Sequence, residues 1–520
     1  MSDDRRSISS GMWRAAMGIL GGRLTGMVRD VVLAAWWGTS DALGAFFVAF
    51  TIPNVFRRIF GEGVLSESFV PLFNERLEKE GKPAAFNAFS QVLTVAMVLL
   101  VVMVVILGAI GGIVLPVLSG FPQLVARLTL ILLPYLLFIC LFGFTLGVLN
   151  SLGRFALPFL SAGLLNVFMI IGTIWLCPRM GNAEESQING LAIAVVASGL
   201  VQLSSMLWLL KKAGYRWRWT LNLKAPVIRE LWLLAVPALV GAGIYQLNIL
   251  CDRLVAGWLG GLAVTSLYYS ERLIYLPVGV FAVALSASCM PVMSRAAARD
   301  NRDEMLGAMV YSLRHVLFLT VPCVVAVMML GQDMVNVLFR RGAFDATSSA
   351  ATVAALLYYA PGIPAFAAAK IVRGAFFSMK DTRTPVRVGF VCLIINLVLN
   401  LALMGPLQQR GLALATVVSA TVSAGWLLIV LFQRLPGHAP AWQGFGGSML
   451  RLIVACGAMG GSMAGARLLC VWSQDMLAGK LAALSLTLAC GGVVFIAVQL
   501  LTRSQDCREM LDLFRRKKAS

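Results

Sequence analysis

Two arginines stand deep inside apolar stretches of this 520-residue chain, where charged groups are costly. Arg23 lies about ten residues into the first stretch, roughly 15 Å deep at 1.5 Å per residue, and Arg272 lies about as deep in a later one. A lone Arg at the bilayer centre costs at least about 2.5 kcal/mol, so each should face protein or water. Guanidinium groups around one cavity would suit a phosphorylated oxyanion, because their planar fork makes bidentate hydrogen bonds to phosphate. For both arginines the alternative is a structural ion pair inside a helix bundle.

Further arginines accompany these two. Arg29 follows Arg23 by six residues, about 120° around an ideal helix, and nearby glycines permit a bend that brings both into one cavity. Arg57 and Arg58 stand at the end of the next apolar stretch, and Arg253 stands near the end of another. Arg58 and Arg253 are expected to extend toward the membrane surface. The cluster would repel a cationic drug, so it predicts transport of an amphiphile with an anionic, phosphorylated head.

The acids of these stretches each adjoin an arginine in sequence: Asp30, Asp252 and Glu271. Sequence neighbours on a helix point about 100° apart, so adjacency alone does not predict an ion pair.

The composition of the chain indicates which classes of protein can hold these charges. Hydrophobic residues make up 59% of the chain and charged residues 13%, and the mean hydropathy is +0.84. These values exclude a soluble enzyme, a disordered chain and a disulfide-stapled domain. The ten cysteines form no CxxC pair and there are two histidines, so no zinc or redox site is expected. No P-loop motif is present, so ATP is not expected as the direct energy source.

The hydrophobic pattern predicts an all-α polytopic membrane protein. Of the 43 Lys and Arg residues, 27 fall in loops on one side and four on the other, which places both termini in the cytoplasm. The net charge of +19 is therefore mostly a topology signal, and no nucleic-acid partner is expected. The fourteen expected spans are 12–37, 42–60, 90–115, 126–149, 156–177, 188–210, 230–250, 262–290, 306–330, 348–370, 386–404, 411–433, 448–469 and 480–502.

An internal repeat organises these spans. Asp30, Gly38 and Phe46-Phe47 recur as Asp252, Gly260 and Tyr268-Tyr269 at an offset of 222, and Pro134, Gly147 and Pro158 recur as Pro361, Gly374 and Pro385 at an offset of 227. Six spans separate equivalent positions, which predicts two six-helix lobes related by a pseudo-twofold axis along the membrane normal. The expected parts are an N-lobe (1–225), a C-lobe (226–440), and two extra spans with a basic cytoplasmic tail (441–520).

Several motifs resemble a known family. They are Arg23-Leu-Thr-Gly-Met-Val-Arg29-Asp30, Ala45-Phe-Phe-Val-Ala-Phe50, Pro53-Asn-Val-Phe-Arg57-Arg58-Ile-Phe-Gly-Glu62-Gly63, Ser68-Phe-Val-Pro71 and Tyr268-Tyr-Ser-Glu-Arg272-Leu. They resemble the lipid II flippases of bacterial peptidoglycan synthesis, the MurJ/MviN family of the multidrug/oligosaccharidyl-lipid/polysaccharide exporter superfamily. The resemblance covers essentially the whole chain.

The resemblance implies that the protein moves lipid II, a lipid-linked disaccharide-pentapeptide, from the inner to the outer leaflet of the cytoplasmic membrane by alternating access. It implies that Arg23, Arg29, Arg57 and Arg272 bind the pyrophosphate. Asn54 and Glu271, in the same motifs, complete the predicted substrate site, and Glu62 falls on another motif position. It also implies that the last two spans form a groove for the undecaprenyl tail.

A sodium site is also implied by the resemblance, at Asp252, Asn396, Asn400 and Thr416. Asn396 and Asn400 are four residues apart on one helix face, which suits oxygen ligands converging on a small cation. Where Asn400 stands the family example has a carboxylate, so an interhelical hydrogen-bond cluster is the alternative. Sodium or the membrane potential is the expected driving force.

Two positions depart from the family pattern. Gly44 stands where many members have an Asp, with Asp41 three residues earlier, and Tyr275 replaces an acid one turn after Arg272. Because of these two departures, a divergent paralogue of the family is an alternative. The remaining alternatives are a flippase for another polyprenyl-pyrophosphate-linked glycan, a multidrug antiporter, and a membrane scaffold without transport.

Overall fold

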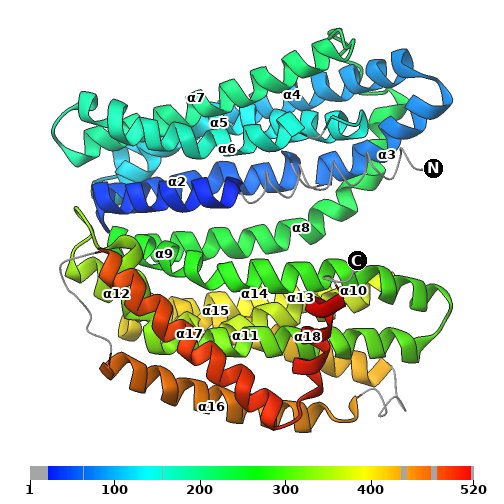
Figure 1. Cartoon of the computed structure of the whole chain (residues 1–520). Helices are drawn as coiled ribbons and strands as arrows, with labels where there is room; N and C mark the ends of the chain where they lie inside the picture. Colours follow the sequence, from blue (N-terminus) through cyan, green and yellow to red (C-terminus); the bar gives the residue numbers. More distant parts are fainter. Residues whose placement is uncertain (1–20, 62–63, 155, 435–441, 470–476, 517–520) are drawn as a thin grey trace. The chain divides into compact units, whose positions relative to one another are not determined.

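The computed structural model describes residues 21–61, 64–154, 156–434, 442–469 and 477–516. Within these ranges the chain is helical and contains no strand, as the apolar runs predict (Figure 1). Eleven of the described helices are long and apolar enough to cross a membrane, or twelve if one bent pair is a single span. The protein is therefore a multi-pass membrane protein of the predicted all-α class.

These twelve coincide with twelve of the fourteen expected spans. The expected span 12–37 lies partly outside the described residues, which are helical over 21–37. The expected span 230–250 falls within α8 (Pro226–Trp258), whose 33 residues are long enough to cross a bilayer. The count of fourteen is consistent with the described helices and stays a prediction.

The first of two compact units comprises residues 1–265 and Arg341–Phe344. Its long helices run beside one another, with α5 packed between α2, α4 and α7. In α4 the side chains of Val105 and Ile113 are 63% and 74% exposed, which is typical of a helix facing lipid. Besides α8, the unit contains α2 (Asp41–Phe56), η1 (Arg57–Gly61), α3 (Val64–Lys79), α4 (Lys82–Val114), η2 (Leu115–Val117), α5 (Gly120–Ser151), α6 (Ala156–Ile171), η3 (Gly172–Leu176), η4 (Cys177–Met180) and α7 (Glu184–Lys212).

The second unit comprises Ser266–Arg340 and Asp345–Ser520, and α9 (Gly261–Pro277) begins in the first unit and continues into the second. The lobe boundary at residue 225 was predicted from the sequence repeat, whereas these two units are defined by packing contacts. The boundary at residue 225 therefore stays a prediction. The unit contains η5 (Val278–Ala282), α10 (Val283–Ala298), α11 (Arg302–Phe339), α12 (Ala346–Tyr359), α13 (Gly362–Ser378), α14 (Arg383–Leu407), α15 (Gln409–Arg434), α16 (Phe445–Leu469), α17 (Leu477–Leu501) and α18 (Gln505–Arg516).

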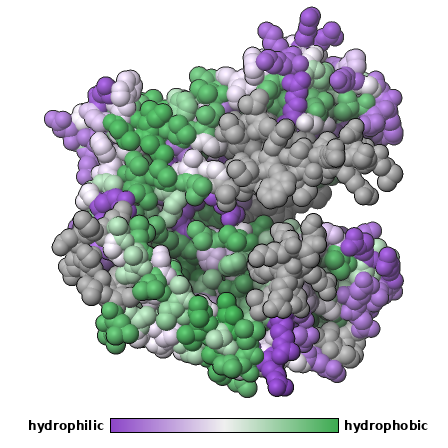
Figure 2. Space-filling view, in the orientation of Figure 1, coloured by the Kyte–Doolittle hydropathy of each residue, from purple (hydrophilic) through white to green (hydrophobic). Residues whose placement is uncertain are grey.

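The helices α16 and α17 pack on α11 through a buried apolar cluster that includes Phe318, Leu452 and Phe495. The short α18 also reaches α11, where Asp506 forms an ion pair of 2.7 Å with Arg314. The face shown in Figure 2 carries broad apolar areas, with hydrophilic residues gathered toward its edges, as expected of a protein that crosses a bilayer.

Local geometry agrees with the sequence repeat. Gly38 and Gly260, 222 residues apart, both have positive φ values, +57° and +92°, in the turns before α2 and α9. Each of those helices then passes into a π-helix: η1 begins at Arg57 and η5 at Val278, 221 residues later. Single π-helical turns widen a helix and change where the following side chains point. Both halves therefore alter their second helix at nearly equivalent positions.

The repeated prolines have different effects on the helix in the two halves. Helix α5 continues through Pro134, whereas at the equivalent Pro361 the chain breaks into α12 and α13, which are bent by 47°. A proline inside a helix removes one backbone hydrogen bond, and the surrounding packing decides whether the helix kinks or breaks.

The start of α2 contacts the start of α9 within the first unit. The Oδ1 atom of Asp41 accepts a hydrogen bond of 2.7 Å from the backbone N–H of Gly261, one of the unpaired donors at the N-terminus of α9. A Cβ atom added to Gly44 would lie 2.3 Å from the Cα of Gly261. The glycine that departs from the family pattern is therefore required here by close helix packing.

We expect Gly44→Ala to lower the free energy of unfolding by about 1–3 kcal/mol, because the added methyl group forces α2 and α9 apart. Thermal unfolding of the purified protein in detergent would measure this as a lower Tm. The matched control is Gly112→Ala in α4, where a Cβ meets nothing within 4 Å. Equal Tm values for the two variants would contradict the close contact.

Candidate functional site

A buried polar cluster surrounds Arg29, one of the predicted cavity arginines. The guanidinium is 7% exposed and forms an ion pair of 2.6 Å with Asp30, its neighbour in sequence. Its Nη1 donates a hydrogen bond of 2.9 Å to Oδ1 of Asn166 on α6. The amide of Asn166 in turn donates to the hydroxyl of Thr25 (3.1 Å) and the carbonyl of Gly22 (3.2 Å). Arg29 therefore ties the helix of residues 21–37 to α6.

This arrangement gives Arg29 a positioning role in the described conformation. Adjacent residues do not usually face each other on a helix, yet the long Arg29 side chain reaches the carboxylate of Asp30, the next residue. Because both groups are buried, removing one partner would leave a charge in a low-dielectric setting. Arg23, two turns earlier on the same helix, is exposed and is therefore the more accessible of the two cations.

Arg57 and Asn54 lie where α2 passes into η1. The side-chain amide of Asn54 donates to the carbonyl of Phe50, one turn earlier (3.1 Å). Arg57 is half-buried, and its backbone N–H closes the last turn of α2 beyond Pro53. The π-helix begins at Arg57, so the backbone widens where this guanidinium leaves the helix. Glu62 lies outside the described residues.

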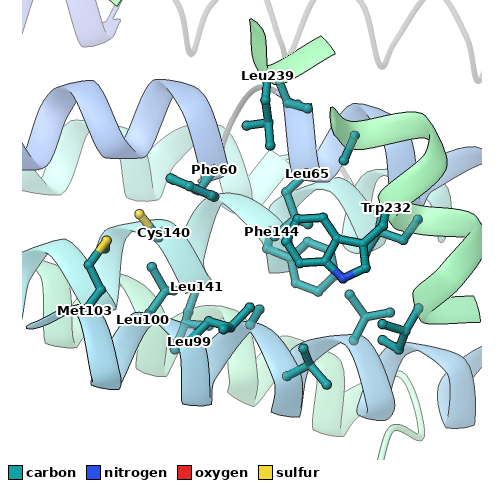
Figure 3. Close-up of a pocket in the computed structure, with 17 residues that line it drawn as sticks. Phe60, Leu65, Leu99, Leu100, Met103, Cys140, Leu141, Phe144, Trp232 and Leu239 are labelled. Carbon is teal, nitrogen blue, oxygen red and sulfur yellow. The ribbon is translucent and has the colours of Figure 1, made fainter. Parts of the chain in front are cut away.

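An apolar pocket of about 780 Å³, including its open side, lies beside this segment between η1, α3, α4, α5 and α8 (Figure 3). Phe60, Leu65, Phe144 and Trp232 contribute large side chains to its wall. All of its lining residues are apolar, apart from the indole nitrogen of Trp232 and the Cys140 thiol. It carries no cationic group, so it is not the predicted anion site.

Arg272 and Glu271 lie on α9 in the second unit. Arg272 is exposed and stacks on the ring of Tyr268 one turn earlier, with the guanidinium carbon 4.6 Å from the ring centroid. Its Nη2 also donates a hydrogen bond of 2.6 Å to the Tyr268 hydroxyl. Glu271 accepts a hydrogen bond of 3.2 Å from the hydroxyl of Tyr359 on α12. The Tyr268 contacts hold the guanidinium on the exposed face of α9, and Glu271 joins α9 to α12.

The predicted sodium ligands occur in two places. On α14 the Asn400 amide donates to Oδ1 of Asn396 (2.9 Å), and both residues are buried. On α15 the hydroxyl of Thr416 donates to the Leu412 carbonyl (3.0 Å). Asp252 belongs to the other unit, where its Oδ2 accepts from Asn248 (3.4 Å). These oxygen atoms are of the type that binds Na⁺, but the two asparagines also hydrogen-bond each other, and the sodium site stays a prediction.

Sequence reasoning missed Asn166 and the role of Asp41. Asn166 interrupts the apolar run Ala156–Ile171, and a polar side chain inside a span is itself a signal of interhelical hydrogen bonding. Asp41 was noted only as a displaced family acid. Its position in the first turn of α2 gives no sign that it also hydrogen-bonds the start of α9.

Comparison with known proteins gives consistent findings. A family model described as lipid II flippase MurJ matches residues 33–498. A Vibrio cholerae protein described as a probable lipid II flippase MurJ is 33% identical over 441 residues, which cover 81% of this chain and 82% of that protein. A solved structure of lipid II flippase MurJ in an inward closed conformation has a TM-score of 0.77 at 22% identity, covering 96% of this chain and 99% of that one. An inward-facing multidrug resistance MATE family transporter of the MOP superfamily has a TM-score of 0.66 at 17% identity, covering 79% and 94%.

We expect Asn166→Ala to lower the free energy of unfolding by about 1–3 kcal/mol, because it removes a hydrogen bond to the buried Arg29 charge. The measurement is the Tm of the purified protein in detergent. Val167→Ala, at a 39% exposed position on the same helix, is the matched control. If the Asn166 variant were no less stable than the control, the cluster would not hold α6 to the first helix.

Proposed function

Since this chain belongs to the lipid II flippase MurJ family, we propose that it moves lipid II from the inner to the outer leaflet of the bacterial cytoplasmic membrane. It is a transporter rather than an enzyme. Its substrate would be undecaprenyl-pyrophosphate bearing a disaccharide-pentapeptide, and both of its termini would lie in the cytoplasm. At the level of single residues, the main support for this proposal is the exposed guanidinium of Arg272, which Tyr268 holds on a membrane-spanning helix.

The chemistry of Arg272 supports recognition of the pyrophosphate. An exposed cation at this depth is stable where it meets water or an anion, because hydrocarbon gives it neither. The Tyr268 contacts restrict the side chain, so less conformational entropy is lost when it binds an oxyanion. A guanidinium can then make two parallel hydrogen bonds to one phosphate group.

In the first unit, Arg23, Arg57 and Asn54 would be the residues that recognise an anionic head group, and the buried Arg29 would fix the helix that carries Arg23. Alternating access further requires that the substrate bind the inward-open and outward-open states with different affinity. The exposed arginines can supply that difference if their distances to the pyrophosphate change between the two states.

The driving force would be the membrane potential or a sodium gradient. Moving the anionic head from an inside-negative cytoplasm to the outer face is favoured by about 2.3 kcal/mol per charge for each 100 mV. If Na⁺ takes part, Asn396, Asn400 and Thr416 would be the residues of the second unit that hold it, and Asp252 would be the predicted ligand from the sequence of the first unit. Its chemical contribution would be a positive charge that changes the relative stability of the two states.

The test is a depletion–rescue experiment in a bacterium whose own lipid II flippase is depleted. We expect the wild-type chain to restore growth. Arg272→Ala should reduce transport at least about tenfold, because each lost hydrogen bond to a charged group is worth about 1.5–3 kcal/mol. Arg295→Ala, an exposed arginine in the last turn of α10, is the matched control.

Two outcomes would overturn the proposal. A correctly inserted wild-type chain that fails to rescue would exclude the lipid II assignment, and native mass spectrometry of co-purified lipid would then reveal any other polyprenyl-pyrophosphate glycan. Full rescue by Arg272→Ala would exclude the arginine-based mechanism.

A further inference from the structure

A lysine that the proposed site does not use lies inside a membrane span. Lys370 is on α13, the second helix of the bent pair that forms one candidate span. It precedes the end of α13 by eight residues, which corresponds to about 12 Å of helix. Its side chain is exposed and forms no hydrogen bond or ion pair with any described residue. An ammonium group at this depth needs water or an anion.

Helix α9, which carries Arg272, runs beside α12 and α13 in the same direction. Three contacts in rising order along both helices show this common direction. They are the hydrogen bond from Ser270 to the Thr352 carbonyl (2.8 Å), the hydrogen bond from Tyr359 to Glu271 (3.2 Å), and the ring contact between Tyr275 and Phe366 (5.8 Å). The next turn of α13 after Phe366 contains Lys370.

Lys370 shares a helix face with Phe366. The spacing of four residues places their side chains one above the other, and Arg373 continues the same face. Arg272 precedes Tyr275 by three residues, or about 4.5 Å, and Lys370 follows Phe366 by four, or about 6 Å. Counted along the helices from the Tyr275–Phe366 contact, Lys370 is therefore about 10 Å from Arg272, toward the end of α13 at Ser378.

We propose that Lys370 is a second oxyanion-binding residue of the transport site, with Arg373 adding positive potential beside it. The proposal rests on the proposed function, since it assigns Lys370 to the substrate that Arg272 would hold. The bound group would be an oxyanion of the lipid-linked substrate, either its second phosphate or a carboxylate of its peptide. Arg373 is half-buried and its Nε donates to the Ala369 carbonyl (3.0 Å), so Lys370 is the more mobile cation.

A lysine suits this second position. Its compact ammonium group has three donors on a flexible stem, so it can follow an anion that moves along α13. The stacked guanidinium of Arg272 is more restricted. A substrate entering from the cytoplasmic side would meet Lys370 and Arg373 before it reached Arg272.

The first experiment tests the location of Lys370 without requiring lipid II. Lys370→Cys in membranes should react with a membrane-impermeant anionic thiosulfonate at least about tenfold faster than Val398→Cys, whose parent side chain is apolar and 58% exposed on α14. The wild-type chain gives the background from its native cysteines. Labelling no faster than that of Val398→Cys would place Lys370 against lipid and overturn the proposal.

The second experiment tests the role. In the depletion–rescue strain, Lys370→Gln should reduce transport about tenfold or more, whereas Lys370→Arg should retain most of it. Lys211→Gln, at an exposed position in the last turn of α7, is the control. Full activity of Lys370→Gln overturns this inference and leaves the proposed function intact. Failure of the wild-type chain to rescue overturns the proposed function instead.

Thermal shifts of the purified protein distinguish the two sources of the oxyanion. Inorganic pyrophosphate should raise the Tm of the wild-type protein but not that of Lys370→Gln if the residue binds phosphate. A short peptide with free carboxylates should give this difference if the residue binds the peptide. The same shift in both proteins with both probes would overturn the proposal.

Discussion

The cost of placing a cation in hydrocarbon is the constraint that organises this protein. An arginine or lysine inside a span must find an acid, a polar side chain, water or an anionic ligand, because the backbone of the helix already satisfies its own hydrogen bonds. Arg29 meets this requirement inside the protein, through Asp30 and Asn166. Arg272 and Lys370 are exposed, and this difference separates a structural cation from candidates for substrate binding.

The backbone deviates from a regular α-helix near several of these cations. The π-helix η1 begins at Arg57, and η5 begins six residues after Arg272. A break at Pro361 precedes the helix that carries Lys370. Each deviation changes the direction of the turns that follow it, so the segments before and after it can present their side chains in different directions. The near-equivalent positions of η1 and η5 indicate that the two halves share a π-helical turn in their second helix.

Close packing of small residues supports the same arrangement. Gly44 allows α2 to approach Gly261, and Asp41 then hydrogen-bonds the N-terminus of α9. That contact fixes the start of the helix that carries Arg272 further along. A family acid at position 44 would not fit against Gly261, so its absence here follows from packing and is not by itself a sign of lost function.

The sequence alone was enough to predict the all-helical class, the family and twelve of the spans that the structure describes as helices, because these depend on hydrophobic run lengths and motif spacing. It did not determine which cations are buried. Arg29 and Arg23 look equivalent in sequence, yet only Arg29 meets Asn166, from a helix more than a hundred residues away. It also did not single out Lys370, which stood at the edge of an expected span until the bent pair α12–α13 placed it inside one. Helix rotation and long-range side-chain contacts arise from packing between segments, and local spacing does not encode them.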